Sequence, residues 1–252
     1  DIGGAALLID AVVVAFTILL GAGLGRLLKM DRDTALLTSI GSSICGAAAV
    51  LGAEPVVKSQ PYKAAVAVST VVIFGTLSMF LYPALFRAGM LDLTTEQMGL
   101  FTGATLHEVA HVVGAGNAMG QAISDPAIIV KMIRVMMLAP VLVILSIILS
   151  RREAAAGQTG QQRKITIPWF AFLFLAVIGF NSLHLLPSGV VSAINSLDTF
   201  LLTMAMTALG AESSFEKFKK AGARPFLLAA LLYAWLFFGG YWLVKGMTAW
   251  MA

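Results

Sequence analysis

Charged side chains are scarce in this sequence. Only 12% of its 252 residues are Asp, Glu, Lys or Arg, and 59% are hydrophobic, whereas a soluble domain carries about 25% charged residues. A chain with so little polar surface cannot cover itself in water, so a soluble domain is excluded. Repeated apolar runs of about 20 residues indicate helices that cross a lipid bilayer. The net charge of +4 comes from short basic loops that set topology, so no nucleic-acid partner is expected.

Cysteine and histidine are almost absent. The single cysteine, Cys45, excludes an intrachain disulfide and a four-cysteine zinc site. Residues 107–111 read H-E-x-x-H, which on a helix places two imidazoles on one face beside a carboxylate, as in zinc proteases. Zinc there needs a third protein ligand, and the remaining histidine, His184, belongs to a different apolar run. An intramembrane zinc protease is therefore kept only as a minor alternative.

Two further motifs are missing. The chain contains no G-x-x-x-x-G-K-[ST] phosphate-binding loop, so we expect no ATP-driven transport by this chain alone. It also has no signal-peptide pattern of basic start, short apolar run and small-residue cleavage site. We expect no enzymatic activity and no cofactor.

The apolar runs define the predicted organisation. They predict membrane spans near residues 3–24, 34–51, 64–82, 99–123, 126–150, 165–186, 196–209 and 225–244. A polar linker, 151–164, separates the membrane helices of 1–150 from those of 165–252. This linker and the turn at 216–224 are basic, so the positive-inside rule places both in the cytoplasm. The first span then runs outside to inside, and the last runs inside to outside.

The first and last spans resemble each other. At a constant offset of 219 residues (235 − 16), Phe16 matches Trp235, Gly21 matches Gly240 and Arg26 matches Lys245. Similar spans that run in opposite directions predict an inverted repeat. A complete repeat would need a segment like residues 204–222 before the first span, so we expect N-terminal helices to be missing.

Three stretches are too rich in glycine and polar residues for plain spanning helices: 39–50, 102–120 and 203–215. Backbone polar groups in hydrocarbon must be satisfied, so a broken helix survives only when buried in protein or lining a wet cavity. Transporters use such helix ends to bind substrate or coupling ions. The alternative is close helix packing through small residues. We predict broken helices at the first two stretches and leave the third open.

Ionisable residues inside the predicted spans are candidates for function. Asp10 lies in the middle of the first span, and His107 and Glu108 lie within a predicted break. Lys131 and Arg134 are three residues apart and therefore share one helix face. The alternative for this pair is that both side chains snorkel to the membrane surface.

Several long motifs resemble the YeiH-type sulfate exporter family, and the resemblance covers nearly the whole chain. They read MDRDTALLTSIGSSICGAAAVLGAEPVV, ATLHEVAHVVGAG, IVKMIRVMMLAP, GFNSL and MAMTALGAESSF. The resemblance implies a multi-pass protein of the bacterial inner membrane, with further N-terminal helices and a fold like that of bile-acid/sodium symporters. It also implies that glutamine is common where this chain has His111, which weakens the zinc interpretation.

We therefore predict an all-α integral membrane protein, a polytopic bundle with inverted repeats and broken, crossing helices. The expected function is secondary transport of a small anion, such as sulfate or a sulfonate, by alternating access. Its expected partners are that anion, a coupling proton or sodium ion, and the lipid bilayer; a homodimer is left open. The alternatives are a Na⁺/H⁺-type cation antiporter on the same fold and, from another class, a scaffold or receptor without transport.

Each candidate residue has an expected role. Half-helix N-termini at Ser42, Ser43 and Gly46 would bind the anion through backbone N–H groups. Lys131 and Arg134 would supply positive charge. The candidate substrate-binding residues are Ser42, Ser43, Cys45, Gly46, His107, Lys131, Arg134 and Asn181, and the candidate coupling-ion residues are Glu108 and Asp10; no metal ligand is expected.

Overall fold

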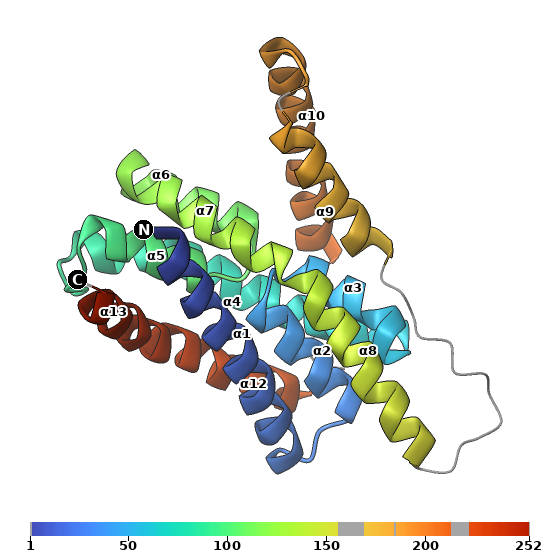
Figure 1. Ribbon diagram of the computed structural model, residues 1–252. Helices are drawn as coiled ribbons and strands as arrows, with labels where there is room; N and C mark the ends of the chain where they lie inside the picture. Colours follow the sequence, from blue (N-terminus) through green and yellow to red (C-terminus); the bar gives the residue numbers. More distant parts are fainter. Residues whose placement is uncertain (1, 156–168, 184, 213–221, 252) are drawn as a thin grey trace.

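The computed structural model describes residues 2–155, 169–183, 185–212 and 222–251, and these residues form helices and short loops without a strand (Figure 1). The helices are α1 (Ile2–Leu27), α2 (Arg32–Ser43), α3 (Ala47–Val57), α4 (Pro61–Arg87), α5 (Thr95–Thr105), α6 (Val109–Met119), α7 (Gln121–Met136), α8 (Leu138–Ala155), α9 (Trp169–Ser182), α10 (Ser188–Glu212), α12 (Ala223–Ala234) and α13 (Gly240–Met251), with a π-helical turn, η1 (Trp235–Gly239), joining the last two. The predicted all-α class is confirmed.

Among the residues that the structure describes, four helical segments are long and apolar enough to cross a membrane. They are Ala6–Leu27, Pro61–Arg87, Gln121–Arg151 and Ala223–Trp250, each between 22 and 31 residues long. About 20 apolar residues suffice to cross the hydrocarbon layer. The predicted spans at 3–24, 64–82, 126–150 and 225–244 correspond to these segments, so the integral membrane class is confirmed.

The first and last spans lie side by side and run in opposite directions (Figure 1). Arg224, at the start of α12, donates a hydrogen bond to the carbonyl of Lys29, just beyond the end of α1. Midway along both helices, the rings of Phe16 and Trp235 contact each other with centroids 4.3 Å apart. These two residues are matched by the sequence repeat, so the two antiparallel spans meet at equivalent positions.

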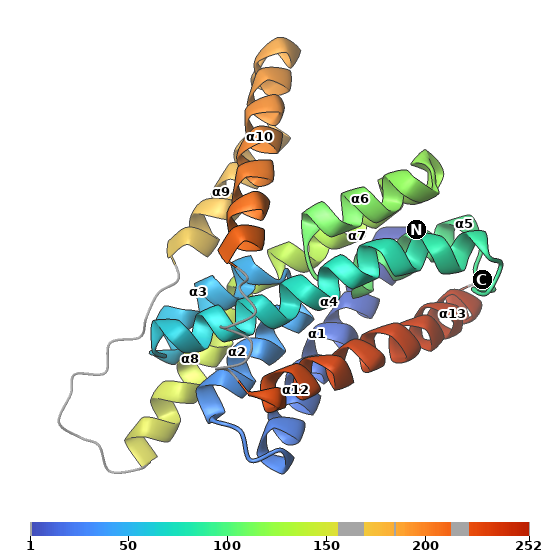
Figure 2. The same cartoon turned by 180° about the vertical axis from the view of Figure 1, so that it is seen from behind.

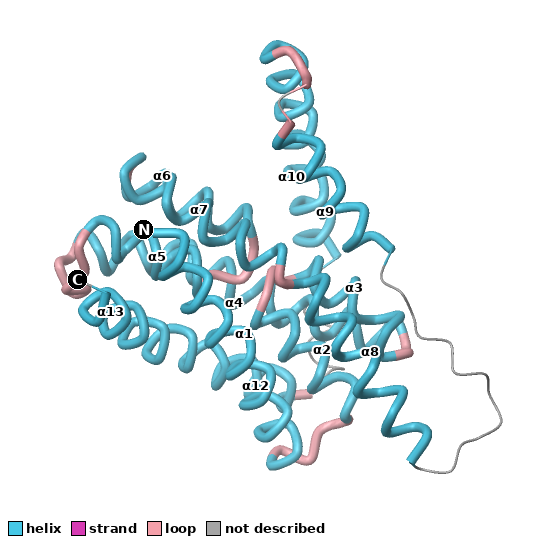
Figure 3. The backbone as a smooth tube through the Cα atoms, in the orientation of Figure 1, coloured by secondary structure: helices cyan, strands magenta, loops and turns pink. Residues whose placement is uncertain are grey.

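Both breaks predicted from glycine and polar content are present. The first break separates α2 from α3 at residues 44–46, and the second separates α5 from α6 at residues 106–108. Figure 3 shows them as short loop segments within the bundle. The third candidate, 203–215, differs: α10 continues unbroken to Glu212, and residues 213–215 lie outside the described part.

The hairpin of α9 and α10 extends away from the other helices in both views (Figures 1 and 2). Its exposed large side chains include Leu173, Phe180, Leu197 and Phe200, as expected for helices that face lipid or another apolar surface. Of the linker predicted at 151–164, residues 151–155 continue α8, and residues 156–164 lie outside the described part.

Candidate ion site at the crossing of two broken helices

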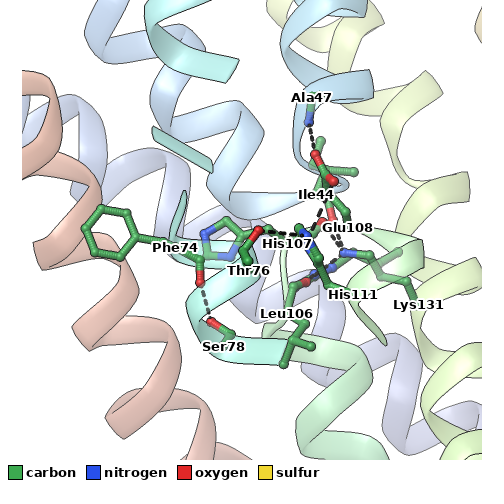
Figure 4. Close-up of polar contacts among 11 residues, drawn as sticks. Ile44, Ala47, Phe74, Thr76, Ser78, Leu106, His107, Glu108, His111 and Lys131 are labelled. Atoms are coloured by element: carbon green, nitrogen blue, oxygen red, sulfur yellow. Dashed lines mark hydrogen bonds and ion pairs between the residues drawn. The ribbon is translucent and has the colours of Figure 1, made fainter. Parts of the chain in front are cut away.

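Lys131 of α7 joins the two breaks (Figure 4). Its Nζ donates hydrogen bonds to the carbonyl of Ile44 in the first break at 2.8 Å, and to those of Leu106 and His107 in the second at 2.8 and 2.6 Å. An ammonium group has three N–H donors, so all of them are used. We call the region where Lys131 holds residues 44–46 beside residues 106–108 the crossing.

Arg134, one turn further along α7, stabilises the end of α5. Its two terminal nitrogens donate to the carbonyls of Ala104 and Leu106. The last carbonyls of a helix have no partner within it and carry partial negative charge, so a cation is favourable there. Lys131 and Arg134 are both 0% exposed. The snorkelling alternative for these residues is therefore wrong.

Glu108 provides the opposite charge at the start of α3. Its Oε1 accepts a hydrogen bond from the backbone N–H of Ala47, the first residue of α3, at 3.1 Å. Glu108 is also the residue directly before α6. Helix N-termini carry partial positive charge, so a carboxylate is favourable at the N-termini of both α3 and α6.

Gly46 makes this approach of Glu108 possible. Its φ is +69°, a conformation that glycine adopts at little cost, and a Cβ at this position would lie 2.3 Å from Cγ of Glu108. The glycine therefore serves both the turn of the backbone and the close packing of the carboxylate.

His111 of α6 lies between Glu108 and α4. Its Nε2 is 3.3 Å from the Thr76 hydroxyl, and its Nδ1 is 3.8 Å from Oε2 of Glu108 (Figure 4). The ring packs directly on the α4 backbone, where a Cβ on Gly75 would lie 2.5 Å from Nδ1. Glu108 and His111 are both buried.

The zinc-protease geometry is not formed. The H-E-x-x-H arrangement requires one continuous helix, but α6 begins at Val109, and His107 and Glu108 precede it in the second break. Within the described residues, no cluster of three or more His, Cys, Asp or Glu side chains is arranged to hold a metal ion.

Asp10 of α1 is also buried, and it is the other buried acid among the described residues. It is 0% exposed, and neither carboxyl oxygen has a hydrogen-bond partner among the described residues. The charges that act on it are those of Arg134 and Lys131. The same lack of a partner applies to Thr38 Oγ1, Ser42 Oγ, Thr102 Oγ1, His107 Nδ1 and Arg134 Nε. Buried polar groups in proteins are nearly always paired, so each exception calls for an explanation such as a bound ion.

Two residues occupy a different place from the one predicted. Ser42 and Ser43 were expected at a half-helix N-terminus, but they form the last turn of α2, the C-terminal end. Carbonyls rather than N–H groups are free at such an end. The N-terminus predicted here begins instead at Gly46, and the N–H of Ala47 is bonded to Glu108. Cys45 is a buried free thiol within this break.

Asn181 is the one candidate that the structure does not bring to the crossing. It is exposed on α9, in the hairpin that extends away from the bundle. Conversely, the structure adds Gly75 and Thr76, which contact His111 from α4. The sequence signal for them is the Gly-Thr pair in the apolar run VVIFGTLSMF, at a position where α4 continues without a break.

These features define an all-α, polytopic membrane protein whose two broken helices meet at buried charges. A family model described as "Conserved hypothetical protein 698" matches residues 1–229. Together with the relatives below, this match shows that the chain belongs to the UPF0324 membrane protein family, which includes YeiH. The predicted relationship to YeiH and the predicted membrane location are therefore confirmed.

Bacterial membrane proteins across several genera are similar to the chain. It is 65% identical over 251 residues to a UPF0324 membrane protein of Bacteroides thetaiotaomicron, covering 99% of this chain and 75% of the relative. It is 53% identical to a UPF0324 membrane protein of Bordetella bronchiseptica, covering 98% and 77%. It is 48% identical to the UPF0324 inner membrane protein YeiH of Escherichia coli K12, covering 95% and 68%. No solved structure matches the chain.

Proposed function

We propose that this protein is a secondary transporter of the bacterial inner membrane that moves a small anion, such as sulfate or a sulfonate, by alternating access coupled to protons. The observation that carries the proposal is the crossing, where buried charges of both signs stabilise the ends of two broken helices. The name of the Escherichia coli relative, an inner membrane protein, supports the location.

The energetic cost of the crossing argues for a function in ion binding. A charged residue at the centre of a membrane helix costs at least about 2.5–3.5 kcal/mol on insertion scales. Lys131, Arg134 and Glu108 offset this cost by satisfying the free backbone groups at the breaks. Continuous helices satisfy their own backbone groups and would need no buried charges for this purpose. Irregular backbone inside a membrane protein is typical of ion and substrate sites.

The groups at the crossing suit an anion together with a proton. Lys131 has no free N–H, so its contribution to anion binding is electrostatic attraction rather than contact. Direct contacts would come from Arg134 Nε and from the Ser42 hydroxyl, which have no partner among the described residues. Guanidinium donors bind oxyanions well. The carboxyls of Asp10 and Glu108 would carry the coupling proton.

One observation favours a cation antiporter as the second candidate. Both oxygens of Asp10 and Oε2 of Glu108 are buried acceptors without a hydrogen-bond partner in the described part of the chain. Carboxyl oxygens of this kind bind protons or cations in transporters. The two candidates therefore differ in the sign of the transported ion.

Flux into proteoliposomes distinguishes them. We expect an imposed pH gradient to drive accumulation of labelled sulfate or of a small sulfonate. We expect Arg134→Ala to reduce anion binding more than Arg134→Lys does, because lysine keeps the positive charge and loses only the Nε donor. Sodium-dependent proton movement without anion flux would instead establish the antiporter, and wild-type anion affinity in both variants would remove Arg134 from the site.

A further inference from the structure

Two buried polar atoms face each other at the second break. Oε2 of Glu108 and Nδ1 of His111 are 3.8 Å apart, and neither has a hydrogen-bond partner among the described residues. This separation exceeds the range of about 2.7–3.2 Å for a hydrogen bond. A movement of about 1 Å would form one.

The other end of each side chain is already held. Oε1 of Glu108 accepts from the N–H of Ala47 at the start of α3. Nε2 of His111 is paired with the Thr76 hydroxyl of α4, and Gly75 allows the imidazole to lie against the α4 backbone. Two separate elements therefore hold the carboxyl and the imidazole with their unpartnered atoms toward each other.

We propose that Glu108 and His111 bind one proton in common, and that this is the coupling proton of the proposed transport. The proton arrives from water and lies either on the carboxyl, as O–H···N, or on the imidazole, as O⁻···H–N⁺. The pair changes from one negative charge to net neutral. Its role in coupling rests on the proposed function; the shared binding of the proton does not.

The groups around the pair favour one proton over two. Lys131 of α7 acts electrostatically on both members. The backbone N–H of Ala47, which follows the first break, donates a hydrogen bond to Glu108. His107 precedes Glu108 and lies beside Tyr233 of α12, with ring centroids 6.4 Å apart. Arg134 and Asp10 act electrostatically on Lys131. From α4, Thr76 and Gly75 contact the imidazole of His111. A second proton would make the pair positive beside the fixed ammonium, which is unfavourable.

Infrared pH titration of the purified full chain in lipid tests the proposal without requiring transport. The C=O stretch of a protonated carboxyl reports the proton on Glu108, and the ring modes of an imidazolium report it on His111. Loss of the C=O band in Glu108→Gln assigns that band. In His111→Gln we expect the midpoint of proton uptake to move about one pH unit lower, because the remaining carboxyl no longer shares the proton. Thr76→Val should move it in the same direction by less. The control is Thr70→Val, since Thr70 also lies on α4 but is fully buried and donates to the Ala67 carbonyl instead of pairing with His111.

An unchanged or higher midpoint in His111→Gln would overturn the proposal. If His111→Gln does not fold, Thr76→Val decides by the same criterion. Loss of sulfate flux has no bearing on this result. A shifted midpoint in a protein that transports nothing would support the shared proton and contradict the proposed transport function. Normal flux with an unshifted midpoint would support the transport function and contradict the shared proton.

Discussion

The two broken helices of this protein interrupt their backbones in different ways. The first break turns at Gly46, with φ of +69°. The second passes through an extended segment from Leu106, with ψ of 148°, to Glu108, with ψ of 154°, and needs no residue at positive φ. The charges that satisfy them also differ, because a carboxylate lies at the start of α3 and two cations lie at the end of α5.

The comparison shows that neither break is complete alone. Glu108 belongs to the second break and bonds the helix that follows the first. Lys131 bonds carbonyls from both breaks at once. Each break therefore supplies or shares a partner that the other break needs. The substitutions below should show how much each contact contributes to each break.

Replacing Lys131 should have the largest effect. Lys131→Met leaves the buried carbonyls of Ile44 and His107 without their donor, whereas the Leu106 carbonyl keeps Arg134. Each such loss costs about 1–3 kcal/mol, so we expect destabilisation of about 2–6 kcal/mol, or failure to fold. Thermal unfolding in detergent measures it. The control is Lys245→Met, since Lys245 pairs with exposed Asp92 and solvent screens such a surface pair, so little stability should be lost. Equal stability of the two variants would contradict the bridging role.

Shortening Glu108 should affect the first break selectively. Glu108→Ala removes the acceptor for the Ala47 N–H, at a cost of about 1–2 kcal/mol for a lost helix cap. Glu108→Gln keeps an acceptor oxygen and should cost less. Hydrogen exchange should show faster exchange in the first turn of α3 for the alanine variant. Unchanged protection there would mean that Glu108 does not hold the start of α3.

Adding a methyl group at Gly46 should have an effect of similar or smaller size. Gly46→Ala combines positive-φ strain with a Cβ 2.3 Å from Glu108, so we expect about 1–3 kcal/mol of destabilisation. Gly89→Ala is the matched control because Gly89 has φ of +67° with no atom within 4 Å of an added Cβ. The unfolding temperature of Gly89→Ala should fall less than that of Gly46→Ala. An equal fall in both would assign the whole effect to the backbone.

The smallest effect is expected outside the crossing, at Asp31 before α2. Burial of the Asp31 carboxyl acts to raise its pKa, but hydrogen bonds from Lys63 and Thr34 outweigh burial and hold the pKa below the ordinary value of 3.8. A carboxyl with a lowered pKa stabilises the fold above its unfolded pKa and loses that contribution as the pH falls. Asp31→Asn should therefore be less stable than wild type at neutral pH, with the difference shrinking as the pH falls below about 4. A difference that persisted in acid would exclude the charge as its cause.

The sequence predicted the fold and the location of the breaks because both depend on composition. Apolar runs indicate spans, and glycine with polar residues in a span indicates a break. The direction of the first break was wrong at Ser42 and Ser43, since composition does not show which residue begins the next half-helix. The partners of Lys131 were also unpredicted, because they are backbone carbonyls up to 87 residues away, and every residue carries such a carbonyl. Thr76 was missed because α4 is continuous there.

Proton-coupled flux in Glu108→Gln tests the central claim most directly. The substitution keeps the shape of the side chain and removes its titrating proton. We expect the variant to fold and to exchange anion across proteoliposome membranes, while losing accumulation driven by a pH gradient. If Glu108→Gln accumulates anion with the pH dependence of the wild type, the crossing does not carry the coupling proton and the account is contradicted.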